Sequence, residues 1–368
     1  MRTGTNVTRA KTLRHAADLI EAGIVPASNR VALDDVAARY AVAISPAVVA
    51  EIDPADPDDP IARQFVPDVA ELVAAPEERG DPIGDDAHSP VPGIVHRYPD
   101  RVLLKLVHVC PVYCRYCFRR EMVGPRGRGT LSTDEIARAL DYIRANMNIW
   151  EVILTGGEPL LMSPRRLRVV MRELTRISHV KIVRVHSRMP AVAPERVTAE
   201  MLRALKASGK AIYVVLHVNH AREMTEAVRA ACAQFVDAGI PMLSQTVLLR
   251  GVNDDANILD TLLRTLVECR IKPYYLHHGD LAPGTGHFRT SIADGQELMR
   301  ALRGRLSGIA QPTYVLDIPG GAGKVPAGPN YLQDTGEKSS RRYVVEDPCG
   351  GHHLYPPELA DQQRGTQR

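Results

Sequence analysis

Three cysteines stand close together in the sequence, at Cys110, Cys114 and Cys117, with the spacing C-x3-C-x2-C. An apolar, strand-like run at residues 101–109 leads into them, so we expect them on a loop at the end of a strand. Three neighbouring thiolates cannot all pair as disulfides, but they can bind three irons of a 4Fe–4S cluster and leave one iron open. The alternatives are ordinary thiols or part of a zinc site, although zinc needs a fourth ligand and more often uses paired C-x2-C elements.

Polar or glycine-rich residues follow several other predicted strands. They are Gly156-Gly157-Glu158-Pro159, His186-Ser187-Arg188, His217, His277-His278-Gly279-Asp280 and Asp317. In a barrel of alternating strands and helices, functional residues gather at the C-terminal ends of the strands. Any one of these stretches could be a solvated loop or an interior hydrogen-bonding residue, but their shared position favours a common site.

Lys324 ends a glycine-rich stretch, residues 319–324. The stretch lacks the spacing of a phosphate-binding P-loop, and Val325 stands where that motif needs serine or threonine. A lysine on a glycine-rich loop after a strand can form a Schiff base with pyridoxal 5′-phosphate (PLP). Taken alone, however, the pattern favours an exposed lysine on a flexible loop.

Strands and helices alternate in the part of the chain that must position these residues. Strands are expected at residues 101–109, 151–155, 181–186, 211–218, 241–249, 272–277 and 313–317. Helices are expected between them, at residues 132–147, from 163, 198–209, 223–238, 255–269 and 292–306. The first helix opens with a capping box at Ser132 and Glu135. This order predicts an α/β fold, a parallel and partial TIM-like barrel.

The chain divides into three predicted segments. Residues 1–95 form a helical N-terminal extension, since residues 8–22 and 32–40 carry apolar residues at helical spacing. Residues 96–330 form the barrel, and residues 331–368 form a C-terminal tail. Cys232 and Cys269 fall on predicted helices and are interpreted as buried, small apolar residues.

The composition excludes several classes of protein. A net charge of +3 with 24% charged residues does not indicate binding to nucleic acid or to an anionic membrane. The sequence has no apolar run of membrane-spanning length and no signal-peptide pattern at its start. Six cysteines in 368 residues do not make a secreted disulfide framework, so we expect a cytoplasmic protein.

The cysteine loop resembles the cluster motif of the radical S-adenosylmethionine (SAM) superfamily. The resemblance implies that the open iron binds SAM and that electron transfer to SAM yields a 5′-deoxyadenosyl radical. It also implies that SAM is held by residues on the later strand ends. These are Gly156, Gly157, Glu158, Ser187, Arg188, His217 and Gln245.

Several longer strings resemble one family within that superfamily, lysine 2,3-aminomutase. They are residues 96–104, the cysteine loop with Arg119-Arg120, and residues 245–253, 273–275, 287–290 and 317–324. The resemblance, from about residue 81 to 332, implies that Lys324 holds PLP and that Arg97, Tyr98 and Arg101 bind its phosphate. It implies further that Arg119 binds the substrate carboxylate, while Asp280 and Asp317 bind the distant ammonium of lysine.

The activity implied is isomerisation of L-lysine to β-lysine, with an electron donor such as flavodoxin or ferredoxin. A rival is a related enzyme that makes β-lysine for modification of an elongation factor, and another is a non-catalytic iron–sulfur regulator. The family's zinc site is in doubt, because Asp255 stands in place of a cysteine and the tail offers only Cys349, His352 and His353. The sequence therefore does not determine the oligomeric state that zinc supports in the family, and a homo-oligomer stays among the expectations.

Overall fold

A nine-stranded sheet forms the body of the protein in the computed structural model, which describes residues 11–124, 129–336 and 342–357. The strands follow one another in chain order, and β2 to β8 are parallel, whereas β1 and β9 pair antiparallel at the two edges. The bounds are β1 Ile94–Tyr98, β2 Arg101–Val107, β3 Glu151–Gly156, β4 Ile182–Ser187, β5 Ala211–His217, β6 Met242–Val247, β7 Ile271–His277, β8 Thr313–Ile318 and β9 Gly323–Pro326. The predicted α/β, mostly parallel barrel is confirmed, and the barrel is nearly closed.

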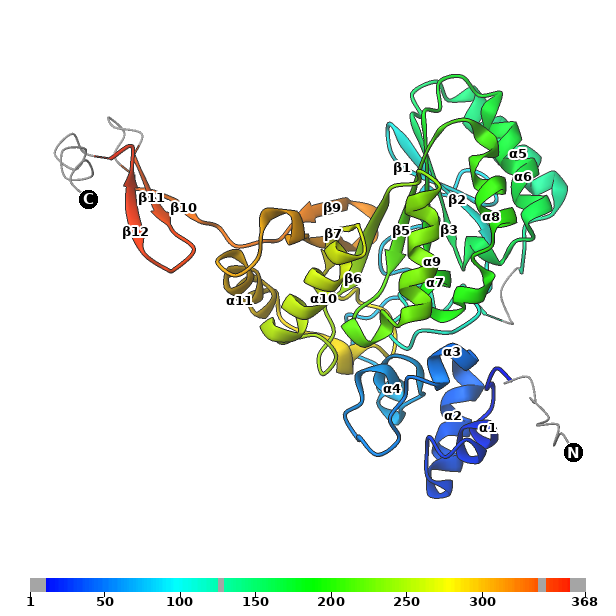
Figure 1. Ribbon diagram of the computed structural model, residues 1–368, viewed down its shortest axis with the longest axis horizontal. Helices are drawn as coiled ribbons and strands as arrows, with labels where there is room; N and C mark the ends of the chain where they lie inside the picture. The colour runs from blue at the N-terminus through cyan, green and yellow to red at the C-terminus, as the bar shows by residue number, and fades with distance from the viewer. Residues whose placement is uncertain (1–10, 125–128, 337–341, 358–368) are drawn as a thin grey trace, which may run out of the picture.

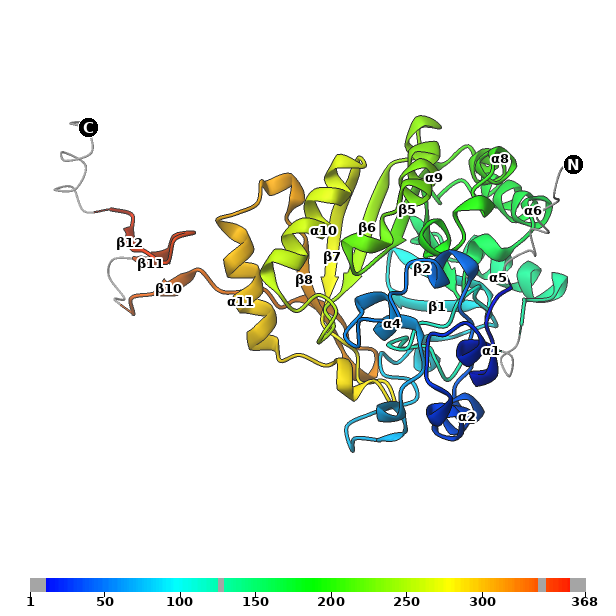
Figure 2. The ribbon, with the colours of Figure 1, turned by 60° about the horizontal axis from the view of Figure 1, so that its bottom comes forward.

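Helices cover the outer face of this sheet (Figures 1 and 2). Their bounds are α5 Thr133–Ala145, α6 Pro164–Thr175, α7 Met189–Val192, α8 Ala199–Leu205, α9 Glu226–Asp237, α10 Ala256–Glu268 and α11 Ile292–Arg303. Each buries an apolar stripe; in α6 the stripe is Leu167, Val170, Met171 and Leu174. The helix stripes and the outward-facing strand residues form one continuous hydrophobic core.

The sequence explains where most of these helices begin. Ser132 and Glu135 form the predicted capping box of α5, and Pro164 occupies the first turn of α6. Asp255 accepts backbone hydrogen bonds from Asn257 and Ile258 and so caps α10. One predicted start was wrong: α9 begins at Glu226 rather than at residue 223, because Thr225 provides the cap.

The inside of the barrel is lined by alternate residues of each strand. On β4, Val183 and Val185 are buried under the helices, whereas Arg184 and His186 are only partly covered on the other face. The register continues this inner face from strand to strand. It aligns Lys105 with Thr155, His186 with Val215, His217 with Gln245, Val247 with His277, and Asp317 with Lys324. The C-terminal ends of the strands therefore surround a polar interior.

Between residue 11 and the barrel the described chain has four short α-helices: α1 Ala16–Glu21, α2 Arg30–Arg39, α3 Pro46–Val49 and α4 Pro60–Phe65. They gather at one end of the molecule (Figure 1). Two backbone hydrogen bonds join this part to the cysteine loop, from Tyr113 N to Ala43 O and from Arg115 N to Gln64 O. The helix expected at residues 8–22 begins only at Ala16, because residues 11–15 are not helical and Leu13 forms a β-bridge with Ile44. Residues 8–10 lie outside the described residues.

Two segments differ from the expectations. Lys324 lies on β9, because positive φ angles at Gly320 and Gly321 turn the chain back along β8. Residues beyond 331 form a small antiparallel sheet of β10 Leu332–Asp334, β11 Tyr343–Glu346 and β12 His352–Tyr355, which projects away from the barrel beside α11 (Figure 1). The part of the tail after residue 357 lies outside the described residues, and the predicted domain boundaries at 95 and 330 stay predictions.

Candidate active site

The three cysteines lie on the segment between β2 and α5, and none forms a disulfide. Burial raises the pKa of each thiol, and that of Cys117 rises to about 11. Thiolates at such positions need nearby positive charge, which bound irons supply. Within the parts of the chain that are described, no group of three or more His, Cys, Asp or Glu side chains converges on a single metal-ion position. This is compatible with a cluster in which each cysteine binds a different iron.

Arginines on both sides of Cys117 fasten this loop to the N-terminal extension. Arg115 donates to both oxygens of the fully buried Glu71 and, at 2.8 Å, to Ala41 O. Arg120 binds the same carboxylate and donates to Gly284 O at 3.1 Å. Glu71 was not predicted from the sequence, since a lone glutamate in a loop carries no recognisable motif.

The two glycines at the end of β3, Gly156 and Gly157, are required by the chain that enters the cysteine loop. A Cβ atom on Gly157 would lie 2.4 Å from Val109 O, and one on Gly156, whose φ is +108°, would lie 2.7 Å from Val107 O. The next residue, Glu158, uses its carboxylate within the protein: it accepts from Ser187 Oγ and Arg188 N, both at 2.8 Å. Burial raises the pKa of Glu158 to about 7. This segment therefore ties the ends of β3 and β4 to the cysteine loop.

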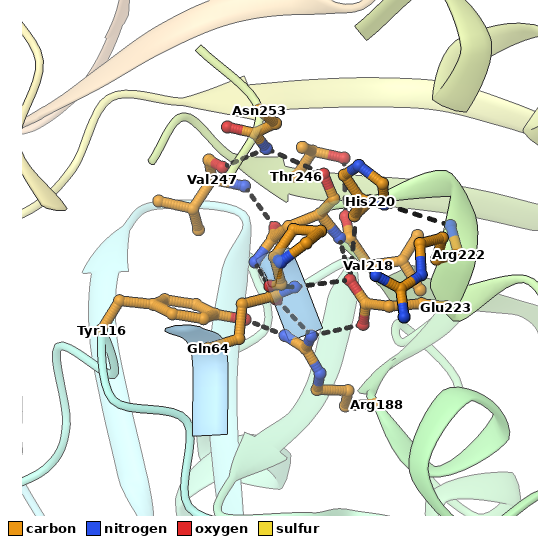
Figure 3. Close-up of polar contacts among 12 residues, drawn as sticks. Gln64, Tyr116, Arg188, Val218, His220, Arg222, Glu223, Thr246, Val247 and Asn253 are labelled. Atoms are coloured by element: carbon orange, nitrogen blue, oxygen red, sulfur yellow. Dashed lines mark hydrogen bonds and ion pairs between the residues drawn. The ribbon is translucent and has the colours of Figure 1, made fainter. Parts of the chain in front are cut away.

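Arg188 belongs to a buried polar network, in which it contacts Gln64, Glu223 and Tyr116 (Figure 3). Its guanidinium binds Glu223, donates to Gln64 Oε1 at 2.8 Å and reaches the hydroxyl of Tyr116 in the cysteine loop. Asn219 extends the network to β6, because its Oδ1 accepts from Val247 N at 2.9 Å. Arg188 therefore connects the end of β4 with α4 and the cysteine loop.

Three histidines, His186, His217 and His277, face the interior from β4, β5 and β7. Burial lowers the pKa of His186, His217 and His277, and that of His217 falls to about 3. These rings are therefore neutral near pH 7. The Nε2 atom of each is buried and has no hydrogen-bond partner among the described residues. Of these three, His217 was predicted, together with Gln245, which its strand register places beside it.

Lys324 projects from β9 towards Asp317, and the two side chains form an ion pair. His277 Nδ1 lies 3.2 Å from Lys324 Nζ. The backbone N–H of Lys324 donates to the Tyr98 hydroxyl at 2.7 Å, and the guanidinium of Arg101 lies over the Tyr98 ring, 3.8 Å from its centroid. The structure thus brings Lys324 and Asp317 together with Tyr98 and Arg101, which lie more than 200 residues earlier in the chain.

Asp85 forms ion pairs with three cationic side chains from separate segments of the chain. Its fully buried carboxylate lies 3.2 Å from Arg97 Nη2, 3.0 Å from Arg119 Nη2 and 3.7 Å from Lys105 Nζ. Burial alone would raise the pKa of Asp85, but Arg119 and Lys105 lower it. Neither Asp85 nor Lys105 was predicted, because their partners lie at least 12 residues away in the chain.

Asp280 follows β7 and lies near the Lys324–Asp317 pair and near the cations around Asp85. Burial and the neighbouring Asp317 raise its pKa to about 7, whereas Lys324 and Arg119 act in the opposite direction. The interior therefore has a carboxylate pair, Asp280 and Asp317, within electrostatic reach of a cationic cluster around Asp85.

Comparison with known proteins identifies the family. A model of the radical SAM superfamily matches residues 104–262, and a Lysine-2,3-aminomutase model matches residues 299–356. The L-lysine 2,3-aminomutase of Clostridium subterminale is 43% identical over 291 residues, which cover 79% of this chain and 70% of that protein. The chain belongs to the lysine 2,3-aminomutase family. The glutamate 2,3-aminomutase of Clostridioides difficile is 38% identical over 304 residues, covering 83% of this chain and 71% of that protein.

A solved radical SAM methyltransferase from Sphaerobacter thermophilus overlaps this aminomutase-family chain with a TM-score of 0.43 and 20% identity, over 61% of this chain and 68% of that one. An overlap of this size supports no argument about function. Among the helices of residues 11–124, 129–336 and 342–357, none is long and apolar enough to cross a membrane.

Membership of the radical SAM superfamily implies a 4Fe–4S cluster and SAM. The cysteine loop fits such a cluster, since its three half-buried thiols are unlinked and Arg188 and Arg119 lie close enough to lower the pKa of individual thiols. In this aminomutase-family chain, Asp255 caps α10 and Asp347 accepts from the N–H groups of Cys349 and Gly351. Asp255 therefore serves as a helix cap, and Asp347 holds the turn around Cys349.

Proposed function

We propose that this protein isomerises L-lysine to β-lysine by moving the α-amino group to the β-carbon. When bound, the cluster and SAM supply the 5′-deoxyadenosyl radical, and PLP carries the migrating nitrogen. An electron donor such as flavodoxin or ferredoxin delivers the electron. The chain's own residues hold these groups, orient the substrate and keep water from the barrel.

The observation that carries this proposal is the ion pair between Lys324 and Asp317. It is a primary alkylammonium bound by a carboxylate inside the barrel, which is the interaction that the ε-ammonium of a lysine substrate requires. Attachment of Lys324 to PLP would release Asp317 for that ammonium. Asp280 adds a second carboxylate there, and Arg119 provides a cation for the α-carboxylate.

Glutamate is the other substrate that a relative's name suggests. Its side-chain carboxylate would meet Asp280 and Asp317, and like charges brought together in a buried site cost several kcal/mol, on the order seen at interfaces. The two aspartates therefore favour lysine and disfavour glutamate.

The PLP site that we propose consists of Lys324 with Arg97, Tyr98 and Arg101. A buried Arg97 Nε has no partner among the described residues, so the guanidinium has a donor left for a phosphate. Tyr98 holds the backbone of Lys324 and lies beneath Arg101. These contacts support the proposal, because they hold Tyr98, Arg101 and Lys324 close together.

The SAM site that we propose lies between the cysteine loop and the ends of β3 to β6. The unpartnered Nε2 of His217 faces this space as a neutral donor or acceptor, with Gln245 beside it. Gly156 and Gly157 keep the backbone close to the cysteines. The polar contacts of three further residues are made mostly within the protein: Glu158 with Ser187, and Arg188 with Glu223 and Gln64. We propose that Glu158, Ser187 and Arg188 fix the walls of the SAM site.

The test is product analysis after anaerobic reconstitution with iron, sulfide, SAM and PLP. With a chemical reductant, L-lysine should yield β-lysine by mass spectrometry, and L-glutamate should yield no β-glutamate above the level of a Cys117→Ala control. β-Glutamate as the main product would replace the proposed substrate. An intact cluster with no product from either amino acid would favour a non-catalytic iron–sulfur protein.

A further inference from the structure

Lys105 is a buried lysine inside the barrel, on the inner face of β2. The parallel register places it beside Thr155 of β3, and its side chain is 8% exposed. Burial lowers its pKa. A lysine is seldom buried this completely without a partner of opposite charge, so its position calls for an anion.

Asp85 is the carboxylate nearest to the Lys105 ammonium, but it accepts no hydrogen bond from it. The Nζ–Oδ2 distance is 3.7 Å, too long for a hydrogen bond. In the described part of the chain, the ammonium forms no side-chain hydrogen bond, and Asp81 and Asp86 act on it only at longer range. Its three N–H donors are therefore available to a ligand.

The two carboxylate oxygens of Asp85 pair with different cations. Oδ1 binds Arg97, whereas Oδ2 binds Arg119 and lies nearest Lys105. No second carboxylate of the described chain forms an ion pair with these three cations, so two positive charges lack a counter-ion. Two anionic groups, a phosphate and a carboxylate, would balance them.

We propose that Lys105 binds the α-carboxylate of the amino acid substrate together with Arg119, and that Asp85 is the positioning residue that holds the two cations side by side. This inference rests on the proposed function. The choice of the carboxylate over the PLP phosphate follows from the shared Oδ2 atom: Lys105 lies with Arg119 and not with Arg97.

Binding measurements on Lys105→Met test the proposal. L-Lysine and L-lysinamide, which lacks the carboxylate, are titrated into the PLP-loaded protein and followed through the PLP absorption band. Lys105→Met should bind lysine roughly ten- to a hundredfold more weakly, as for the loss of a charged hydrogen bond, with lysinamide nearly unaffected. PLP affinity, measured by titrating PLP into the cofactor-free protein, and iron content should match those of the unsubstituted protein.

Lys272→Met is the matched control, because this half-buried strand lysine donates to Gln311 O and does not face the cationic cluster. Lys105→Gln is the second neutral variant and decides the outcome if Lys105→Met does not fold. A lysine-to-lysinamide affinity ratio equal to that of the unsubstituted protein would overturn the proposal. If PLP binding were weaker as well, Lys105 would be assigned to the PLP phosphate instead. If the unsubstituted protein makes no β-lysine, the proposed function fails instead.

Discussion

At the scale of single residues, the site depends on charges held in fixed positions. Burial by itself would raise the pKa of Asp317, yet His277 and Lys324 lower it to about 2. Asp280, which lacks so close a cation, has its pKa raised to about 7. The two carboxylates therefore differ in protonation near neutral pH, although both are proposed to bind one ammonium.

Asp317→Asn should lose lysine turnover while the cluster and PLP remain bound. Removing one partner of a buried charge pair costs roughly 2–5 kcal/mol, and the lower half of that range corresponds to about thirty- to several-hundredfold in kcat/KM. Steady-state kinetics with L-lysine measure the loss, and iron and PLP contents serve as internal checks. Asp134→Asn, at an exposed position on α5, is the control. Unchanged kinetics in Asp317→Asn would show that the ammonium is bound elsewhere.

The raised pKa of Asp280 predicts a pH dependence of lysine binding. Below about pH 7 this carboxyl is largely protonated and cannot pair with an ammonium; above it the carboxylate is ionised. We therefore expect kcat/KM for lysine to rise as pH increases through about 7, since this parameter reports the free enzyme. Asp280→Asn should remove that rise. The same inflection in Asp280→Asn would assign it to another group.

At the scale of elements, the cysteine loop is held from outside the barrel. Glu71, in the short 3-10 helix Val69–Leu72, pairs with Arg115 and Arg120 on either side of Cys117. Gln64 at the end of α4 joins the network around Arg188 (Figure 3). The N-terminal extension thus acts as a support for the cluster, which its helical pattern alone did not reveal.

Glu71→Gln should destabilise the protein and loosen the cluster. It leaves two buried guanidinium groups without their carboxylate, and breaking a buried pair in this way costs about 3–5 kcal/mol. Urea unfolding measures the stability, and iron per chain after reconstitution measures cluster retention. Glu77→Gln is the matched control, because Glu77 forms an exposed pair with Arg289 that is worth about 0–1 kcal/mol. Equal midpoints for the two variants would contradict this role of Glu71.

At the scale of the whole molecule, the sequence predicted the strands and helices, because hydrophobic periodicity and helix caps determine where they form. The order of strands and helices from β2 to β8 was correct except for the short α7, because the longer helices carry their own caps and apolar stripes whereas α7 has no side-chain cap. The parallel arrangement then brings distant strand ends together, which is why residues such as His217, Asp280 and Asp317 could be proposed as one site. Resemblance to the family, rather than any local pattern, identified Lys324.

The remainder could not be predicted because it depends on contacts between distant segments. Asp85 and Glu71 gain their importance from arginines far along the chain. The strand β9 depends on pairing with β8, and residues 319–324 alone resemble a flexible loop. The small sheet of the tail likewise forms by pairing of β10, β11 and β12.

The central claim is that the α-nitrogen of lysine moves to the β-carbon without exchange with solvent. Reconstituted protein with SAM, PLP and a reductant is given L-lysine labelled with 15N only at the α-amino group, and the product is analysed by NMR and mass spectrometry. The account predicts β-lysine with the label retained and bonded to the β-carbon. Loss of the label to solvent, or a product whose α-nitrogen has not moved, would contradict it.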